Sequence, residues 1–240
     1  MEGVNTHEEC DDGFGWFRSY TGELDKLYED DDTVGVKHLI DTVSGTTRWE
    51  RYYVLYALSM GSTYDNMEMV MYLVGKFNVT TKELFSYNCT AFEKAVEEGY
   101  LDMVKYFVET FNLTIEDLRP DQSRGLYLAC CGGHVEVVEY MVDTFRLDNE
   151  DITSKDECIS GHLNKRSVFM VACKEGNTEV VSFFIHRQWL SPGCARDVIK
   201  NLEVYLNELI ELDNLYPISS IVEVITILKS AYPPPKNATC

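Results

Sequence analysis

Hydrophobic and polar positions recur in the same order several times along the chain. Sliding the sequence against itself by 34 residues places 95–111 over 129–145, with apolar, small and acidic positions in register. A third copy, 172–184, follows after a step of 43 residues, and a fourth lies at 57–77. A repeat of this length, with insertions tolerated between copies, is typical of an array of stacked structural units.

Each copy predicts a pair of helices. The first helix, such as 91–98, ends at a glycine that can adopt the left-handed conformation that closes a helix. In the second helix the apolar residues fall at i, i+1, i+4 and i+5 from Met103, so they form one stripe. Neither helix can bury its stripe alone, and we therefore expect neighbouring units to stack around a continuous core. The predicted closing glycines are Gly61, Gly99, Gly133 and Gly176.

Two departures from the regular spacing predict extra residues. From Gly61 to Val70 there are nine residues where the other copies have five, which places four extra residues between the two helices of that copy. The 43-residue step places nine extra residues between copies, within 151–167. The polar segment 153–167 is therefore a candidate partner-specific loop, because long loops between units often carry contacts. A tolerated insertion without a role is the alternative.

Capping residues between the copies predict a further helical turn. Thr80 and Thr114 each have an acidic residue three positions later, which approximates a capping box, and Asp148 is followed by Asp151 in the same way. We expect one of these turns to end before Pro120, since the residue before a proline disfavours the helical conformation.

Both ends of the array resemble degenerate copies. The segment 33–42 is similar to 135–144, so we predict a first unit over 14–43. Near the other end, 220–228 has the pattern of a second helix and is preceded by a helical segment at 197–212.

These patterns together predict an all-α fold. It consists of about six helix-pair units over 14–230, with the degenerate copies serving as caps. We expect 1–13 to be an acidic, flexible N-terminus and 231–240 to be a proline-rich tail.

Three segments, 95–104, 129–142 and 172–184, resemble the helical part of the ankyrin repeat. That family has a first helix of small residues, a Gly-His or Gly-Asn turn and a Val-Val-x-x-Leu second helix, and Cys-Gly-Gly-His-Val-Glu-Val-Val at 131–138 is the nearest match. The resemblance covers about 52–190 and implies an ankyrin-like helical repeat solenoid whose first helices line a concave, partner-binding groove. The variant is similar to the divergent arrays of amoebae and of the large DNA viruses that infect them.

Two features of the ankyrin family are absent. The Thr-Pro-Leu-His start of the first helix is replaced, for example by Thr-Ala-Phe-Glu at 90–93, and so is the Gly-Ala-Asp-Val-Asn linker. We therefore do not expect the standard projecting β-hairpin fingers.

The composition adds a strong acidic bias. Hydrophobic residues make up 45% of the chain, which is enough for a sizeable core, and 40 Asp and Glu against 21 Lys and Arg give a formal net charge of −19. Such a charge repels phosphate backbones and anionic lipid, so we expect no nucleic acid and no membrane partner but a protein with a basic surface. Without a secretory signal or an apolar span, we predict a cytoplasmic protein, in a host cytosol or a virion if viral, with reduced cysteines.

An acidic residue recurs in the first turn of each second helix. It could form a strip that binds cations, but a carboxylate there also stabilises the positive end of the helix dipole, by about 0.3–1 kcal/mol, and we prefer this structural explanation. The acidic residues are Glu68, Asp102, Glu136 and Glu179.

Cysteine and histidine residues do not form a convincing metal or catalytic motif. There is no Cys-x-x-Cys or His-x3-His pair, and Cys130 and Cys173 occupy equivalent positions beside small residues, which favours buried core thiols. We expect His134 to anchor its turn, as the Gly-His turn does in the family that the segment resembles. No phosphate loop or nucleophile elbow is present, so we predict no enzyme activity, no metal, no cofactor and no small-molecule substrate.

The function that this sequence favours is a protein-binding scaffold or adaptor. The alternatives are a structural subunit of a large assembly such as a virion, and an F-box-like ubiquitin-ligase adaptor, because 215–225 faintly resembles the Leu-Pro start of an F-box. The same residues also fit the second helix of a repeat, and we prefer that interpretation. The resemblance implies partner contacts on the first helices, with loop residues as further candidates: Tyr56, Glu93, Lys94, Glu97, Tyr127, Lys174 and Glu175, then His162, Lys165 and Arg166.

Overall fold

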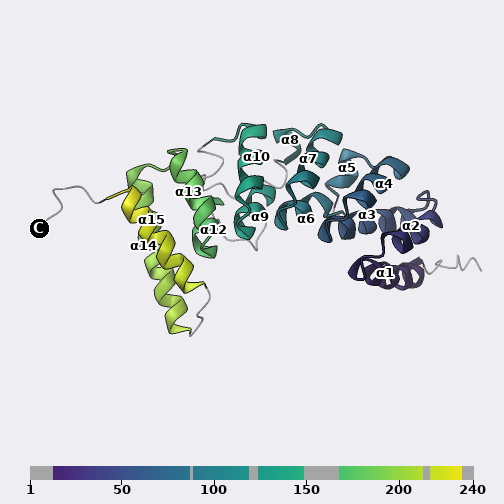
Figure 1. The fold of residues 1–240 in the computed structure, drawn as a ribbon, viewed down its shortest axis with the longest axis horizontal. Helices are drawn as coiled ribbons and strands as arrows, with labels where there is room; N and C mark the ends of the chain where they lie inside the picture. Colours follow the sequence, from purple (N-terminus) through teal and green to yellow (C-terminus); the bar gives the residue numbers. More distant parts are fainter. Residues whose placement is uncertain (1–12, 87–88, 119–123, 149–167, 213–216, 234–240) are drawn as a thin grey trace, which may run out of the picture. The chain divides into compact units, whose positions relative to one another are not determined.

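The computed structural model describes residues 13–86, 89–118, 124–148, 168–212 and 217–233 (Figure 1). Every regular element in these ranges is a helix, as the sequence predicts. The chain divides into two compact units, Met1–Lys94 and Ala95–Cys240, which we call unit 1 and unit 2 and describe separately. Helix α6 (Ala91–Glu97) begins in unit 1 and ends in unit 2.

Unit 1 is built around one long helix, α3. Helix α1 packs against α2 and α3, and α3 packs against α4. Its helices before α6 are α1 (Gly13–Glu29), α2 (Thr33–Asp41), α3 (Arg48–Thr63), α4 (Met67–Phe77) and α5 (Thr81–Leu84).

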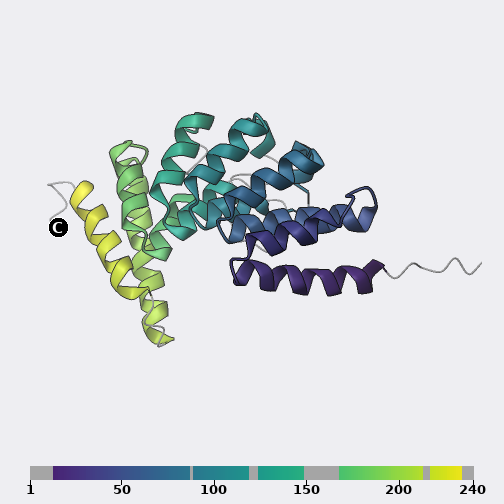
Figure 2. The same cartoon turned by 45° about the vertical axis from the view of Figure 1, so that its right-hand side comes forward.

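Unit 2 contains two rows of helices. The first helices of its pairs contact one another in the order α9, α12, α14, and the second helices in the order α7, α10, α13, α15. Figure 2 shows paired helices of this unit running side by side. The helices are α7 (Leu101–Thr110), α8 (Ile115–Leu118), α9 (Arg124–Gly132), α10 (Val135–Phe145), α12 (Val168–Glu175), α13 (Thr178–His186), α14 (Pro192–Glu211) and α15 (Ile218–Ala231).

One helix-pair register runs through both units. Each second helix from α2 to α13 is preceded by a residue with positive φ, and these residues follow one another at steps of 34, 34, 34 and 43. The core keeps the same steps, because each first helix from α1 to α12 buries one large apolar residue in the equivalent place. The positive-φ residues are Asp31, Asp65, Gly99, Gly133 and Gly176. The buried residues are Leu24, Leu58, Phe92, Leu126 and Phe169.

A second set of positive-φ residues closes the second helices. Asn78 and Arg146 are the left-handed C-caps of α4 and α10, and Asn112 and Gln188 follow α7 and α13. Asparagine tolerates this conformation because its short polar side chain bonds locally. The recurrence of Asn78 and Asn112 in the sequence is therefore explained by helix closure.

The structure corrects the prediction for Gly61. Gly61 lies inside α3 and is buried, and the residue with positive φ in this pair is Asp65. Gly61 therefore occupies the small-residue position of Ala95, and a Cβ on it would lie 3.2 Å from Val70 Cγ2. The predicted four-residue insertion is wrong for the same reason. The first helix of this pair is long because α3 begins at Arg48, about one repeat before α5 begins, so the linking turn and the first helix are continuous.

The predicted linking turns are confirmed where the structure describes them. In α5 the Thr80 side chain accepts from the backbone N–H of Glu83, whose carboxylate accepts from the backbone N–H of Thr80, a complete capping box. The Thr114 backbone N–H donates to Asp117 Oδ2 at 2.8 Å, and α8 ends before Pro120. A further capping box, Thr47 with Glu50, was not predicted. The turn predicted from Asp148 falls on residues outside the described ranges.

The helix pairs predicted at both ends are present as α1 with α2 and α14 with α15. Helix α1 begins at Gly13, within the range predicted to be flexible, and α15 ends at Ala231. Residues 1–12, the loop 153–167 and residues 234–240 lie outside the described residues, so their predicted character stays a prediction.

Side chains at the start of the second helices bond back to the preceding pair. In unit 1, Asn66 Nδ2 donates to Thr33 Oγ1 at 2.8 Å. In unit 2, His134 Nε2 lies 2.8 Å from the Glu97 carbonyl oxygen, and Asn177 Nδ2 donates to the carbonyl oxygens of Cys130 and Cys131 at 2.7 and 2.9 Å. These side chains form a ladder in the repeat register, and the prediction that His134 anchors its turn is confirmed.

A charged network ties α3 to the α5 turn in unit 1. The Arg51 guanidinium makes two bonds of 2.6 Å to the Glu83 carboxylate and a third, of 2.8 Å, to the Phe77 carbonyl oxygen. Arg51, helped by Thr80, lowers the pKa of Glu83 to about 2. Because the folded-state pKa is depressed, this contribution to stability is complete above the unfolded value, about 4.5, and is lost as pH falls from there toward 2.

Replacing Glu83 should remove this acid-sensitive contribution. We expect Glu83→Gln to lower the free energy of unfolding at neutral pH by about 1–2 kcal/mol, since a charged hydrogen-bonded pair is lost. Below pH 4.5 the difference from wild type should shrink. Urea unfolding at several pH values measures both effects. The exposed residue Glu98 offers a control, because Glu98→Gln should stay within about 0.5 kcal/mol of wild type. A constant Glu83→Gln difference down to pH 2 would contradict the assignment.

Replacing Gly99 should destabilise the fold, because its backbone has a positive φ and the His134 ring lies against it. Its φ is +80°, and a Cβ there would lie 2.3 Å from His134 Nδ1. We expect Gly99→Ala to cost about 2–4 kcal/mol and to lower the melting temperature by roughly 5–10 °C. The matched control is Gly75→Ala in α4, where a Cβ meets nothing within 4 Å, and it should raise stability by about 0.5–1 kcal/mol. Thermal melts of both variants measure the two changes in stability. Equal melting temperatures of Gly99→Ala and Gly75→Ala would show that the turn at Gly99 is not constrained.

Candidate functional site

The first helices of unit 2 present a row of half-buried side chains. Tyr127 and Cys131 lie one turn apart on α9, Met170 and Lys174 occupy the equivalent positions on α12, and Tyr205 follows on α14. Lys174 Nζ lies 4.4 Å from the centroid of the Tyr205 ring, a cation–π contact between neighbouring helices. We call these residues, with Glu97, the unit 2 face.

Several predicted contact residues fall on or beside this face. Glu97 occupies on α6 the repeat position that Cys131 and Lys174 occupy on the next two first helices. Glu175 is exposed at the end of α12. The structure therefore brings Tyr127 and Lys174 onto one row of helices with Glu97 at its start.

A second cluster lies on α3 in unit 1, where the sequence had indicated only Tyr56. Trp49, Tyr52, Tyr56 and Met60 follow one another at i, i+3, i+7 and i+11, and all are half-buried. We call them the α3 stripe. The Tyr56 hydroxyl donates to Asp25 Oδ1 of α1 at 2.5 Å. Helical periodicity over 49–60 is the signal that could have found the other three.

The other predicted contact residues belong to neither cluster, although Glu93 lies one turn before Glu97 on α6 and occupies the repeat position of Tyr127. Glu93 and Lys94 are half-buried on the unit 1 part of α6. His162, Lys165 and Arg166 lie outside the described residues, so their assignment stays a prediction.

The second helices use their outward side chains to link one pair to the next. Lys76 Nζ lies 2.6 Å from Asp41 Oδ1 in unit 1, and Arg187 Nη2 lies 2.7 Å from Asp143 Oδ1 at the equivalent repeat positions in unit 2. These two ion pairs thus help to hold neighbouring pairs together. The recurring acidic residues Glu68, Asp102, Glu136 and Glu179 are exposed in the first turns of α4, α7, α10 and α13, where the sequence placed them.

Three thiols in the described part of the chain are buried. Cys130 and Cys173 are completely buried, as predicted, and burial raises the pKa of both well above the usual value. Burial also raises the pKa of Cys89 to about 11. These thiols therefore stay protonated at neutral pH and are weak nucleophiles. Within the described ranges, no three His, Cys, Asp or Glu side chains gather as a metal site would require.

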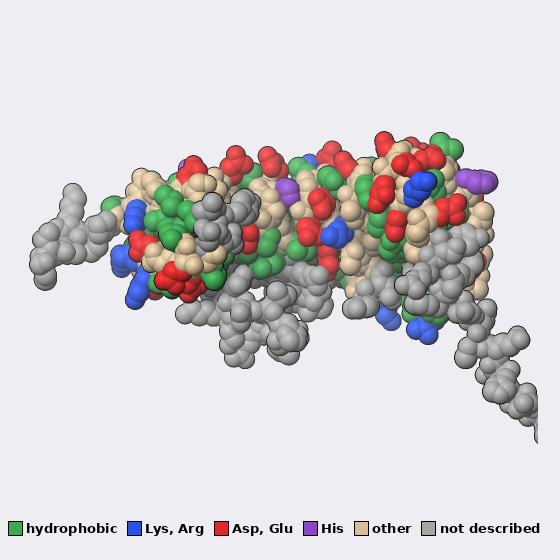
Figure 3. Space-filling view, turned by 90° about the horizontal axis from the view of Figure 1, so that it is seen from below, with side chains coloured by type: hydrophobic (Ala, Val, Ile, Leu, Met, Phe, Trp, Pro, Cys, Tyr) green, Lys and Arg blue, Asp and Glu red, His purple; other side chains and the backbone are tan. Residues whose placement is uncertain are grey.

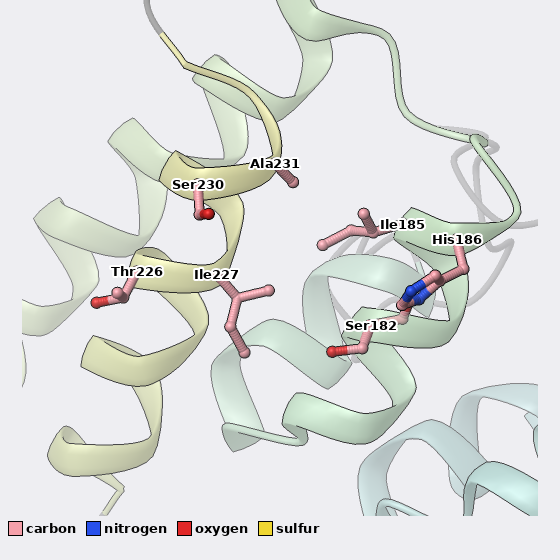
Figure 4. Close-up of a pocket in the computed structure, with 7 residues that line it drawn as sticks. All are labelled: Ser182, Ile185, His186, Thr226, Ile227, Ser230 and Ala231. Carbon is pink, nitrogen blue, oxygen red and sulfur yellow. The ribbon is translucent and has the colours of Figure 1, made fainter.

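A shallow groove of about 450 Å³ runs between α13 and α15 in unit 2 (Figure 4). His186 lies at its rim, with Nδ1 2.7 Å from the Ser182 carbonyl oxygen, so Nδ1 carries a proton. Thr226 donates its hydroxyl to the Val222 carbonyl oxygen at 2.8 Å. Seven residues line the groove: Ser182, Ile185, His186, Thr226, Ile227, Ser230 and Ala231. With no carboxylate in this lining, the groove lacks the acid–base pair that most hydrolytic sites use.

Within unit 2, the large hydrophobic side chains that are exposed belong to the last helix pair, whereas unit 1 exposes Val34, Tyr64, Met71 and Phe85. Ile210, Leu212 and Val222 are 57%, 76% and 45% exposed, although residues of this size are usually buried. Figure 3 shows hydrophobic side chains together over this helix pair, with charged side chains beside them.

Comparison of the chain with models of protein families, with curated proteins and with solved structures gives no match. Among the helices that the structure describes, none has both the length and the apolar character needed to cross a membrane.

Proposed function

We propose that the chain is an ankyrin-like solenoid that serves as a protein-binding scaffold, with the outward positions of its first helices as the binding surface. The recurring helix pair supports this, because five pairs follow one register and successive pairs within each unit pack first helix to first helix. The ladder of Asn66, His134 and Asn177 supports it further.

One observation carries the choice of surface. Some outward side chains of the second helices are joined in ion pairs such as Arg187 with Asp143, and the first helices of unit 2 present tyrosine, methionine and charged groups at half-buried positions, with Lys174 stacked on the ring of Tyr205. Tyrosine and methionine are enriched where proteins meet, since they offer large contact areas at low entropic cost. A protein partner therefore suits the unit 2 face better than a small substrate does.

The proposed partner carries a basic surface. A net charge of −19 attracts such a partner over the range of a Debye length and repels nucleic acid and anionic membranes. We propose neither an enzymatic reaction nor a cofactor.

A structural subunit of a large assembly is the second candidate. The exposed Ile210, Leu212 and Val222 favour it, because hydrophobic side chains gathered at one end of a protein often mark a permanent contact. The F-box alternative has less support, since Ile221, Val224 and Ile225 in the segment that suggested it are buried in the α14–α15 pair. Measuring the amount of this chain in the purified assembly distinguishes the two candidates. A structural subunit should be abundant there, whereas an adaptor should be scarce.

Charge reversal on the first-helix side tests the scaffold proposal. We expect the double variant Glu97→Lys, Glu175→Lys of the full chain to lose, by about tenfold or more, the proteins that wild type captures from source lysate, as two attractive groups become repulsive. Quantitative mass spectrometry of the captured proteins measures the loss.

The matched control is Glu136→Lys with Glu179→Lys, which makes the same change in net charge on the second helices. It should retain capture, and circular dichroism should show both variants folded. Equal losses would mean that only overall charge matters, and undiminished capture by the first variant would remove the first helices from the proposal.

A further inference from the structure

The α3 stripe is unusual for the outward side of a helix. The opposite side of α3 buries Val54 and Leu58 completely, so the stripe of Trp49, Tyr52, Tyr56 and Met60 is not needed for that core. An outward helix surface is normally polar and charged. Tryptophan, tyrosine and methionine are instead the residue types enriched in the central parts of protein interfaces.

The stripe already holds one guanidinium. The Arg48 guanidinium carbon lies 5.3 Å from the centroid of the Tyr52 ring, and Arg48 Nε donates to the Tyr52 hydroxyl at 2.9 Å. Trp49 meets Tyr52 edge to face, with centroids 5.8 Å apart and planes at 84°. The electron-rich ring therefore accepts a cation within this chain, and Arg48 itself is exposed at the start of α3.

A carboxylate flanks the stripe on the side of α1. Asp25 accepts from the Tyr56 hydroxyl through Oδ1, and Glu29 lies one turn further along α1. Burial, helped by Asp25, raises the pKa of Tyr56, so Tyr56 remains a hydrogen-bond donor at neutral pH. Gly22, almost one turn before Asp25, is exposed, and a Cβ on it would meet nothing within 4 Å. There is thus open space at Gly22 on the same helix.

We propose that the α3 stripe, with Asp25 at its side, binds a basic peptide segment of the partner, with arginine side chains stacking on its rings and bonding to the carboxylate. This inference rests on the proposed scaffold function and gives its partner a chemistry. Charge complementarity selects the occupant, because the chain carries a net charge of −19. Arginine suits the site better than lysine, since its planar guanidinium stacks on aromatic rings while still bonding to carboxylates.

Peptide binding to the full-length chain tests the inference. The probe is a short labelled peptide in which arginine alternates with glycine, and its lysine and glutamate analogues, a proline-rich peptide and an apolar helical peptide are compared by fluorescence anisotropy at physiological ionic strength. We expect the arginine peptide to bind most tightly, the lysine peptide several-fold more weakly, and the glutamate peptide not to bind. Tighter binding of the proline-rich or apolar peptide would overturn the proposal.

Matched variants distinguish binding at this site from general electrostatic attraction to the acidic chain. Trp49→Leu and Tyr52→Leu preserve apolar volume but remove the ring, and each should weaken binding of the arginine peptide by about fivefold or more. Tyr106→Leu on α7 is the matched control and should have no effect. Asp25→Asn should weaken binding more than Asp102→Asn, which makes the same change in net charge on α7.

In these variants, either of two peptide-binding results would overturn the inference. One is unchanged affinity in both aromatic variants; the other is an equal loss in Asp25→Asn and Asp102→Asn together with a steep salt dependence, which indicates non-specific attraction. A third result concerns capture from lysate. If Glu97→Lys with Glu175→Lys abolishes capture but Trp49→Leu does not affect it, the α3 stripe is not the binding site, while the scaffold function stands. The two proposals can therefore fail separately.

Discussion

The tight turn between the two helices of a pair is the constraint on which the rest of the structure depends. It needs one residue at positive φ, and the next residue must begin the second helix and, at most turns, bond back to the preceding pair. Where the following pair covers the turn in unit 2, the residue is glycine: a Cβ on Gly99 would meet the His134 ring, and one on Gly133 would meet the Asn177 amide. Covering the turn and bonding to the carbonyl groups beside it are thus done by the same side chain, which fixes the spacing of successive pairs.

The sequence predicted this arrangement where glycine marks the turn and failed where it does not. Around Gly99 and Gly133 the glycine, the apolar stripe and the 34-residue step agree, so helix pairs, core residues and the role of His134 could all be predicted. In the second pair, aspartate takes the positive φ at Asp65, and a glycine four residues earlier is required for close packing instead. A glycine that provides a positive φ and a glycine that allows close packing look the same in the sequence. Only the structure, in which Gly61 lies inside α3, distinguishes the two roles.

That error also hid part of the candidate site. An inserted segment after Gly61 would set the second pair apart from the other copies, so only Tyr56 was identified, by resemblance to other first helices. With α3 continuous from Arg48 to Thr63, Trp49, Tyr52 and Met60 fall on the same stripe. The Lys174–Tyr205 contact could not be predicted for a different reason: α14 is 20 residues long and departs from the repeat pattern, so the sequence did not show which of its residues faces α12.

The first and the second helices differ in how far their outward residues can be substituted without loss of stability. On the second helices, outward residues such as Arg187 and Asp143 join neighbouring pairs, so a substitution there weakens the contact between pairs. On the first helices the core is supplied by residues such as Leu126 and Phe169, which are buried irrespective of what lies at Tyr127 or Lys174. Because half-exposed positions of this kind contribute little to stability, usually within about 0.5 kcal/mol, they can be altered without unfolding the chain. Under the proposed scaffold function, partner choice can therefore vary on the first helices while the ladder and the ion pairs hold the fold constant.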